Sequence, residues 1–342
     1  MTRIWFNHWF RTAYCLIELM KQTDADQLYI IGSNRTEESP IKLQCDEWYH
    51  EEDIPEEKYA EYCLAFCRAH NVDVFVPYRY MAKIAAAREK FEELGVTLIC
   101  ETAEMIELLE DKAAAYERFS KAGINVPEYR VVSTAAQFEA AYAELNEKYD
   151  KLCIKCVNDK GGQSFRIITE TKDEYTQLMY YPTFSIGYDS LNRILNNKGT
   201  FKPMMLMPLL NTPEVEVSAD CFDCVGKRII IPRFKYSGHV EKIIFDSEII
   251  GMVNKVIDIV SPKYICDVQF RFLNGTPYLL EVNARMSGGL PLSCAAAGVN
   301  IPALALKKAL GKAITPEDYS GFTAEEKTIS FVEVPAADRH AL

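Results

Sequence analysis

The sequence predicts an α/β protein whose C-terminal part is α+β. Strand-like and helix-like segments alternate through residues 1–105, which is typical of βα units with a parallel sheet. Residues 106–203 form a second mixed region, and residues 204–342 are rich in short β-like runs. The chain has 342 residues, 49% apolar and 25% charged, which is enough for roughly two or three globular domains. We therefore predict three domains with these bounds.

The first predicted domain has strands at 4–6, 28–31, 72–77 and 96–100, and helices at 11–21, 56–69 and 81–94. The first helix places Leu16, Ile17 and Met20 on one apolar stripe. No G-x-G-x-x-G sequence follows the first strand, so a dinucleotide site of the Rossmann type is not expected.

In the second and third domains the same patterns predict further elements. Helices are predicted over 102–122, ending at Gly123, and over 134–148. Strands are predicted at 128–132, 151–157, 165–169, 204–209, 214–223, 227–234 and 240–245, with helices at 247–260 and 292–311 and a strand pair around Gln269 and Glu281. Residues 180–202 are poorly periodic and predict a mobile connection, and the tail beyond about 312 is left unassigned.

Charge and composition exclude several classes of protein. A net charge of −11 and a pI near 5.1 argue against a general nucleic-acid binder. No apolar run approaches the roughly 18–20 residues of a membrane span, and no signal peptide is expected. The 11 cysteines are therefore expected to be reduced thiols of a cytoplasmic protein. The pairs Cys153/Cys156 and Cys221/Cys224 are not expected to bind zinc, because residues three apart in a strand face opposite sides.

Polar residues at the end of one apolar run predict a site for a metal and a phosphate. Glu281, Asn283 and Arg285 occupy alternate positions and would share one face of a strand. Gln269 lies on the preceding strand, joined through the turn sequence 274–277. Hard oxygen ligands beside an arginine suit Mg²⁺ and phosphate. The alternative is a polar hairpin with a surface Asn–Arg pair.

Three other segments are candidate ligand sites. Lys155 precedes the loop containing Gly161 and Gly162, which could bind phosphate through exposed N–H groups, although a hairpin turn with an extended lysine is the alternative. The apolar run 204–210 suits a base pocket or a plain core strand, and it leads to Glu214. Cations and aromatic residues interleave over 232–239 and suit an anionic substrate or a solvated turn.

In their order along the chain, these segments resemble the ATP-grasp superfamily, most closely its carbamoyl-phosphate-synthase-like and carboxylate–amine ligase branch. The matching motifs are Asp111-Lys112, Lys155, Gly161-Gly162, the apolar run ending at Glu214, Gln269, and Glu281-Val-Asn-Ala-Arg285. The resemblance covers about 1–311. It implies a pre-ATP-grasp domain with a Rossmann-like parallel sheet over 1–105, followed by a two-lobed ATP-grasp fold. The small lobe would be 106–203 with a glycine-rich lid loop, and the large lobe 204–342.

The resemblance also implies roles for individual residues. Lys112 and Lys155 would contact ATP phosphates, and the loop of Gly161, Gly162, Gln163 and Ser164 would close over them. Met207 and Leu209 would offer backbone groups to adenine, Glu214 would bind the ribose, and His239 would lie on the nucleotide side. Gln269, Glu281 and Asn283 would hold Mg²⁺, for which Mn²⁺ could substitute, and Arg285 would stabilise the transferring phosphoryl group. Ser287, Gly288 and Gly289 would line the carboxylate substrate, with Arg233 and Lys235 as further candidates, while Arg271 could pair with Glu281 or reach substrate.

The implied activity is a ligase that turns a carboxylate into an acyl phosphate for attack by an amine or a thiol, giving ADP and phosphate. Two alternatives stay open, namely an ATP-dependent phosphotransferase and a non-catalytic nucleotide-binding module. The expected partners are small carboxylates and amines or thiols, with neither nucleic acid nor membrane. A homodimer is a further expectation, because similar proteins often form oligomers.

Overall fold

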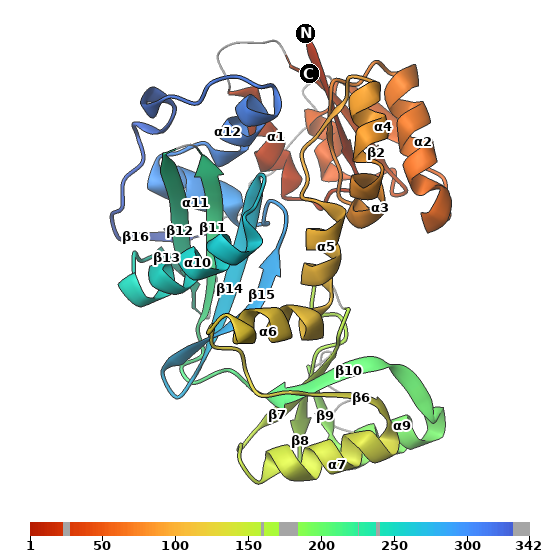
Figure 1. The fold of residues 1–342 in the computed structure, drawn as a ribbon, viewed down its shortest axis with the longest axis vertical. Coiled ribbons are helices and arrows are strands. Elements are labelled where there is room, and N and C mark those ends of the chain that lie inside the picture. Colours follow the sequence, from red (N-terminus) through yellow and green to blue (C-terminus); the bar gives the residue numbers. More distant parts are fainter. Residues whose placement is uncertain (23–27, 159–160, 171–183, 225, 237–239, 331–342) are drawn as a thin grey trace. The chain divides into compact units, whose positions relative to one another are not determined.

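The computed structural model describes residues 1–22, 28–158, 161–170, 184–224, 226–236 and 240–330, drawn as a ribbon in Figure 1. The chain divides into two compact units. The first unit comprises residues 1–107, 216–269 and those from 282 onward, and the second unit comprises 108–215 and 270–281.

The first unit contains a five-stranded parallel sheet in the order β3-β2-β1-β4-β5. Its strands are β1 (Thr2–Asn7), β2 (Leu28–Asn34), β3 (Glu47–His50), β4 (Val74–Val76) and β5 (Thr97–Leu98), and its helices are α1 (Ala13–Lys21), α2 (Glu56–Ala69), α3 (Met81–Ala86) and α4 (Arg88–Glu93). The predicted parallel sheet is confirmed. The strand order reverses between β1 and β4, and open α/β sheets bind ligands at such a switch point.

Two details of this sheet differ from the prediction. The predicted helix over 81–94 is two helices, because Ala87 leaves helical geometry with φ −96° and ψ 14°. Strand β3 is absent from the prediction, because none of its residues is buried and its sequence therefore lacks a hydrophobic alternation.

A six-stranded sheet follows in the order β15-β14-β11-β12-β13-β16. Its strands are β11 (Glu216–Cys224), β12 (Lys227–Lys235), β13 (Val240–Ile243), β14 (Ile265–Leu273), β15 (Thr276–Asn283) and β16 (Lys327–Ser330), and the helices are α10 (Ser247–Val260), α11 (Leu290–Ala297) and α12 (Ile301–Ala309). Residues 270–281 of β14 and β15 belong to the second unit. The unassigned tail supplies β16, which pairs antiparallel with β13.

The predicted helix over 292–311 is likewise two helices, α11 and α12. Gly298 ends α11 with a left-handed φ of 70°, and the Asn300 side chain then caps α12. Among the described residues, no single helix is long and apolar enough to cross a membrane, and α11 with α12 reaches that length only as a pair bent by 104°.

One apolar core connects the parallel sheet to the C-terminal elements of the first unit. Ile4 of β1 and Leu16 of α1 belong to the same buried cluster as Ile231 of β12, Leu290 of α11 and Leu304 of α12. The predicted first domain, 1–105, therefore shares a core with residues beyond 216.

The second unit contains a five-stranded sheet in the order β6-β10-β7-β8-β9. Its elements are α6 (Lys112–Lys121), β6 (Arg130–Thr134), α7 (Ala135–Asn146), β7 (Leu152–Cys156), β8 (Arg166–Thr169), β9 (Ser185–Gly187), α9 (Tyr188–Lys198) and β10 (Thr200–Pro208), and α5 (Ala103–Glu110) precedes them. Helices α7 and α9 cover one face of this sheet (Figure 1). Phe138 of α7, Leu191 of α9 and Ile154 of β7 belong to one buried cluster. Strand β10 runs through the predicted boundary at 203/204.

Two predictions fail in this region, one for a helix and one for a mobile connection. The predicted helix over 102–122 breaks at Asp111, whose carboxylate accepts hydrogen bonds from the N–H groups of Ala113 and Ala114, both at 3.0 Å, and so begins α6. The predicted mobile connection over 180–202 contains β9 and α9 within its described residues. Leu191 and Leu195 are the buried residues of α9. Two apolar positions make a stripe too short to predict a helix from the sequence.

Glu128, just before β6, gives the second unit a testable dependence on pH. Hydrogen bonds from Lys148 first, and from Tyr149 and Arg130, outweigh burial and lower the pKa of Glu128 from 4.5 to about 2. Because the folded pKa is depressed, the stabilisation is present above pH 4.5 and is lost as the pH falls towards 2. Glu128→Gln should therefore reduce the free energy of unfolding by about 1 kcal/mol at pH 7.

Urea unfolding of wild type and Glu128→Gln at pH 7 and at pH 2 checks this expectation. The gap between the two proteins should close at the lower pH. An equal gap at both values would show that the loss comes from packing and not from the carboxylate charge.

Candidate functional site

Strands β11, β12 and β14 of the first unit carry a group of buried polar side chains on neighbouring positions. Ser218, Asp220 and Asp267 are 0% exposed and Arg233 is 2% exposed. Ser218 and Arg233 are direct cross-strand partners in the β11–β12 ladder. Buried polar groups need hydrogen-bond partners, and these residues find them largely in one another.

Asp267 connects this buried group to two predicted metal ligands. Its carboxylate accepts hydrogen bonds from Gln269 Nε2 at 2.6 Å, from Asn283 Nδ2 at 3.2 Å and from the Ser218 hydroxyl. The structure therefore brings Gln269 and Asn283 together, as predicted. Because the amino groups of Gln269 and Asn283 donate to Asp267, the carbonyl oxygens of the two amides point away from Asp267.

Glu281 extends this set along β15. It precedes Asn283 by two residues, and the intervening Val282 is buried, so strand alternation puts Glu281 and Asn283 on one side. Amide and carboxylate oxygens are the hard donors that Mg²⁺ prefers, and their use as a metal site here stays a prediction. Among the described residues, no group of three His, Cys, Asp or Glu side chains could hold a metal, so a metal site here depends on the amides.

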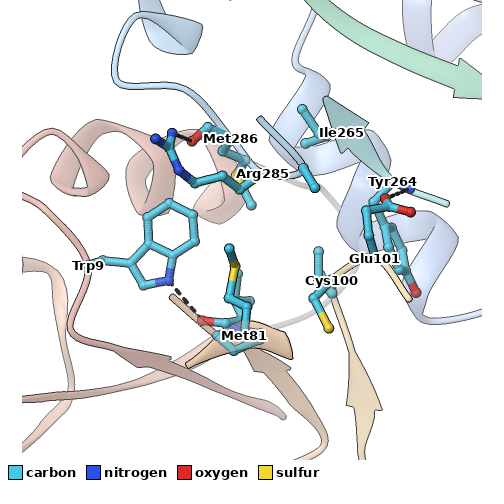
Figure 2. A pocket seen from close by; sticks show the side chains of 12 residues that line it. Trp9, Met81, Cys100, Glu101, Tyr264, Ile265, Arg285 and Met286 are labelled. Carbon is cyan, nitrogen blue, oxygen red and sulfur yellow. Dashed lines mark hydrogen bonds between the residues drawn. The ribbon is translucent and has the colours of Figure 1, made fainter. Parts of the chain in front are cut away.

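Arg285 follows β15 and lies at the switch point of the parallel sheet. Its guanidinium carbon is 5.6 Å from the ring centres of both Phe10, which follows β1, and Tyr78, which follows β4. One guanidinium nitrogen donates to the Met286 carbonyl at 3.0 Å, as Figure 2 shows. Two aromatic rings and a backbone carbonyl thus hold the guanidinium at the edge of the sheet where ligands are expected.

A small pocket adjoins Arg285, and Figure 2 shows the side chains around it, including Trp9 and Met81. Glu101 also lines it, and the Glu101 carboxylate accepts from the backbone N–H groups of Lys263 and Tyr264 at 2.6 and 2.7 Å. Burial outweighs these bonds and raises the pKa of Glu101. Most of the side chains that line the pocket are apolar, and Arg285 is the cation among them.

A hydrogen bond to the buried Asp220 carboxylate fixes the predicted substrate segment 287–289 to the sheet. The hydroxyl groups of Ser287 and Ser293 donate to the Asp220 carboxylate, each at 2.6 Å. Ser287 is 5% exposed and its hydroxyl bonds Asp220, and its role in lining a substrate stays a prediction. A Cβ at Gly289 would collide with the Arg233 guanidinium, whereas one at Gly288 would meet Thr12 Oγ1 at 3.3 Å.

Arg233 is a buried cation with ion-pair partners, and its role as a substrate ligand stays a prediction. It pairs with Glu241 at 2.8 Å and with Asp220 at 3.5 Å. Burial acts to lower the pKa of Arg233, but the Asp220 and Glu241 charges outweigh it and raise that pKa. Lys235 is more accessible and pairs with Glu216 at 2.7 Å. Arg271 lies two residues after Gln269 on the same face of β14.

In the second unit, Lys112 and Lys155 lie on the side of the sheet that α6 covers. Each is 7% exposed, and Lys112 is the first residue of α6. The Lys155 ammonium is 5.8 Å from the ring centre of Tyr116, which belongs to the same helix. The Lys112 N–H also donates to the Val157 carbonyl, just after β7, at 3.4 Å. The two predicted phosphate-binding lysines are therefore held by adjacent elements.

The loop after β7 has the geometry that its glycines require. Gly161 and Gly162 each have φ 66°, a left-handed conformation that disfavours side chains. Ser164 Oγ accepts a hydrogen bond from the Cys156 N–H at 2.8 Å, which ties the loop to the end of β7. Gln163 is in the same turn, and its carbonyl accepts from Arg166 at 3.1 Å. The lid role of this loop stays a prediction.

The predicted adenine segment is apolar, and part of its backbone pairs with β7 or with the residue before it. Met207 and Leu209 are 2% and 7% exposed and belong to a cluster that includes Tyr116. The Leu209 N–H donates to the Lys151 carbonyl at 2.8 Å, and the contact of Leu209 with adenine stays a prediction. Glu214 is exposed in the loop after β10. His239 lies outside the described residues.

A polar cluster at the C-terminal edge of the parallel sheet was not predicted. Glu51 follows β3 and is bonded by His8, at 2.7 Å, and by Tyr59 and Ser33. Burial would raise the pKa of Glu51, but these bonds outweigh it and lower that pKa. Arg79 contacts His8 at 3.4 Å. The available signal was that His8 and Glu51 directly follow strand ends.

Known proteins similar to this chain were found by family, by sequence and by fold. A family model for an ATP-grasp in the biosynthetic pathway with Ter operon matches residues 200–330. The large chain of carbamoyl phosphate synthase from Caldanaerobacter subterraneus subsp. tengcongensis is 26% identical over 225 residues, covering 56% of this chain and 21% of that protein. The chain thus spans about a fifth of the length of the curated relatives it matches.

Two solved structures are similar in fold. The biotin carboxylase domain of Hydrogenobacter thermophilus 2-oxoglutarate carboxylase, in complex with MgADP, ADP and bicarbonate, has a TM-score of 0.65 at 19% identity and covers 92% of this chain and 71% of that one. L-amino acid ligase from Bacillus licheniformis has a TM-score of 0.64 at 14% identity and covers 94% and 77%. The chain is thus similar to the ATP-grasp family over residues 200–330 and shares its fold with these two structures.

Proposed function

We propose that this protein is an ATP-dependent ligase that activates a carboxylate as an acyl phosphate for attack by an amine or a thiol. The observation that carries the proposal is the pair Gln269 and Asn283, whose amide oxygens are turned away from Asp267 beside Glu281 on β15. Such a donor set suits Mg²⁺, and Arg285 follows it on the chain. The similarity to the ATP-grasp family over residues 200–330, together with a structure of similar fold that contains MgADP, supports the same function.

The proposed reaction has two steps. A carboxylate oxygen of the substrate attacks the γ-phosphorus of ATP, and ADP leaves. An amine or thiol then attacks the carbonyl carbon of the acyl phosphate, a proton is lost, and inorganic phosphate leaves. No protein nucleophile is needed in either step, so catalysis rests on positioning and on charge stabilisation.

Each part of the chain has a distinct task in this proposal. Gln269, Glu281 and Asn283 would hold Mg²⁺, which would neutralise charge on the phosphate oxygens. Lys112 and Lys155 would bind phosphates as point charges, and Arg285 would stabilise the transferring phosphoryl group. Closure of the loop at Gly161 and Gly162 would exclude water, which otherwise hydrolyses an acyl phosphate.

A screen for ADP release tests the proposal and identifies the substrate at the same time. Purified protein with Mg·ATP is offered amino acids and small carboxylates, each with and without an amine or thiol, and products are identified by mass spectrometry. The expected result is ADP and phosphate in equal amounts, with a new amide or thioester. A stable phosphoester would identify a phosphotransferase instead, and nucleotide binding without turnover on any pair would identify a non-catalytic module.

A further inference from the structure

The carboxylate of Asp267 occupies an unusual position beside the proposed metal ligands. It is fully buried and lies two residues before Gln269, on the same face of β14. One of its oxygens, Oδ2, accepts from both Gln269 Nε2 at 2.6 Å and Asn283 Nδ2 at 3.2 Å. The other oxygen, Oδ1, accepts from the Ser218 hydroxyl. A single buried acceptor therefore contacts the amino ends of two side-chain amides.

An amide side chain can present either of its two ends to a ligand. The carbonyl and amino ends have almost the same shape, so packing alone does not decide which one faces outward. A carboxylate can only accept hydrogen bonds, and it therefore selects the amino end. Because Mg²⁺ binds oxygen and not amide nitrogen, an amide turned the wrong way would not be a ligand.

We propose that Asp267 is a positioning residue that fixes both amides with their oxygens outward and so makes Gln269 and Asn283 competent metal ligands. This inference rests on the proposed function, since it concerns the same metal. It gives a buried carboxylate a task that does not require contact with the metal. Partners of this kind typically change metal affinity about 10- to 100-fold.

The surrounding bonds keep Asp267 in place. Ser218 donates to Asp267 and accepts from an Arg233 guanidinium nitrogen at 3.2 Å. Arg233 in turn pairs with Asp220 at 3.5 Å, and Asp220 accepts from Ser287 at 2.6 Å. The carboxylate that orients the amides is thus part of one hydrogen-bonded chain that also anchors the segment 287–289.

The test measures metal binding without turnover. Free Mn²⁺ is followed by electron paramagnetic resonance while protein and ADP are titrated, and ADP affinity without metal is measured by calorimetry. In Asp267→Ala the Mn²⁺ affinity of the ADP complex should fall about 10- to 100-fold, with metal-free ADP affinity and overall fold retained. Asp267→Ser, which keeps a small hydroxyl but cannot reach both amides, replaces it if the alanine variant does not fold.

Two comparisons make the result specific. Asp223→Ala removes a carboxylate from the adjacent strand β11, where Asp223 pairs with Arg228 at 3.1 Å, and it should leave Mn²⁺ affinity unchanged. In the double variants Asp267→Ala/Gln269→Ala and Asp267→Ala/Asn283→Ala, the losses should be less than additive, because Asp267 acts through the amides.

The outcomes separate this inference from the proposed function. If wild-type protein does not bind Mn²⁺ with ADP, the metal site itself is wrong, and the role of Asp267 falls with it. If wild type binds Mn²⁺ and Asp267→Ala binds it equally well, the proposed site stands and the positioning role is overturned. Additive losses in both double variants would also overturn it, because Asp267 would then act independently of the amides.

Discussion

Replacing Arg285 with lysine is expected to lower kcat for ADP formation about 100- to 1,000-fold, while metal-free ADP affinity stays unchanged. A guanidinium binds two phosphoryl oxygens at once in a planar fork, whereas an ammonium is a single point charge. The Phe10 and Tyr78 rings, each 5.6 Å from the guanidinium, hold that plane in place, and lysine has no planar group to stack there. The coupled assay for ADP and calorimetry with ADP provide the two measurements.

Arg228→Lys is the matched control for this change. Arg228 is a partly exposed arginine of the first unit that pairs with Asp223 at 3.1 Å and with Asp258 at 2.9 Å, and it has no place in the proposed site. It should leave kcat unchanged. If Arg285→Lys retained wild-type kcat, or if the control lost as much, the role of Arg285 at the phosphoryl group would be excluded.

Replacing Gly289 with alanine is expected to reduce the free energy of unfolding by about 1–3 kcal/mol. The new methyl group would occupy the space of the Arg233 guanidinium, which is 2% exposed and bonded to Glu241, Asp220 and Ser293. Moving this cation would weaken several buried polar contacts together. The free energy of unfolding from denaturant titration, at fixed pH and ionic strength, is the measurement.

Gly288→Ala controls for the addition of a methyl group to the same segment. Its Cβ would meet Thr12 Oγ1 at 3.3 Å, and a side chain of that kind can shift by a few tenths of an ångström. We expect its loss of stability to be clearly smaller than that of Gly289→Ala. Equal losses would mean that backbone geometry at the turn, and not the buried arginine, sets the cost.

Local periodicity was enough to predict the strand that carries the site. Val282, Ala284 and Met286 are buried, whereas Glu281, Asn283 and Arg285 alternate with them and are partly exposed, as the alternating sequence indicated. The predicted helix over 247–260 is confirmed as α10, where the buried stripe is continuous and Asp246 caps the first turn.

Properties that depend on neighbouring strands could not be predicted from one sequence. Arg233 reads as a candidate substrate cation, because Glu241, Ser218 and Asp220 become its partners only when β11, β12 and β13 pair. The function of Asp267 likewise depends on Ser218 and Asn283, which are distant in sequence. The strand in the tail is stabilised by pairing with β13, a long-range contact with no local signal.

Oxygen transfer tests the central claim, acyl-phosphate formation, most directly. The carboxylate identified by the ADP-release screen is prepared with ¹⁸O in both carboxyl oxygens, and the inorganic phosphate released during ligation is analysed by mass spectrometry. The proposed reaction predicts one ¹⁸O atom in each phosphate, because the substrate oxygen that attacks ATP leaves with phosphorus. Unlabelled phosphate, with the expelled ¹⁸O found in another product, would contradict it.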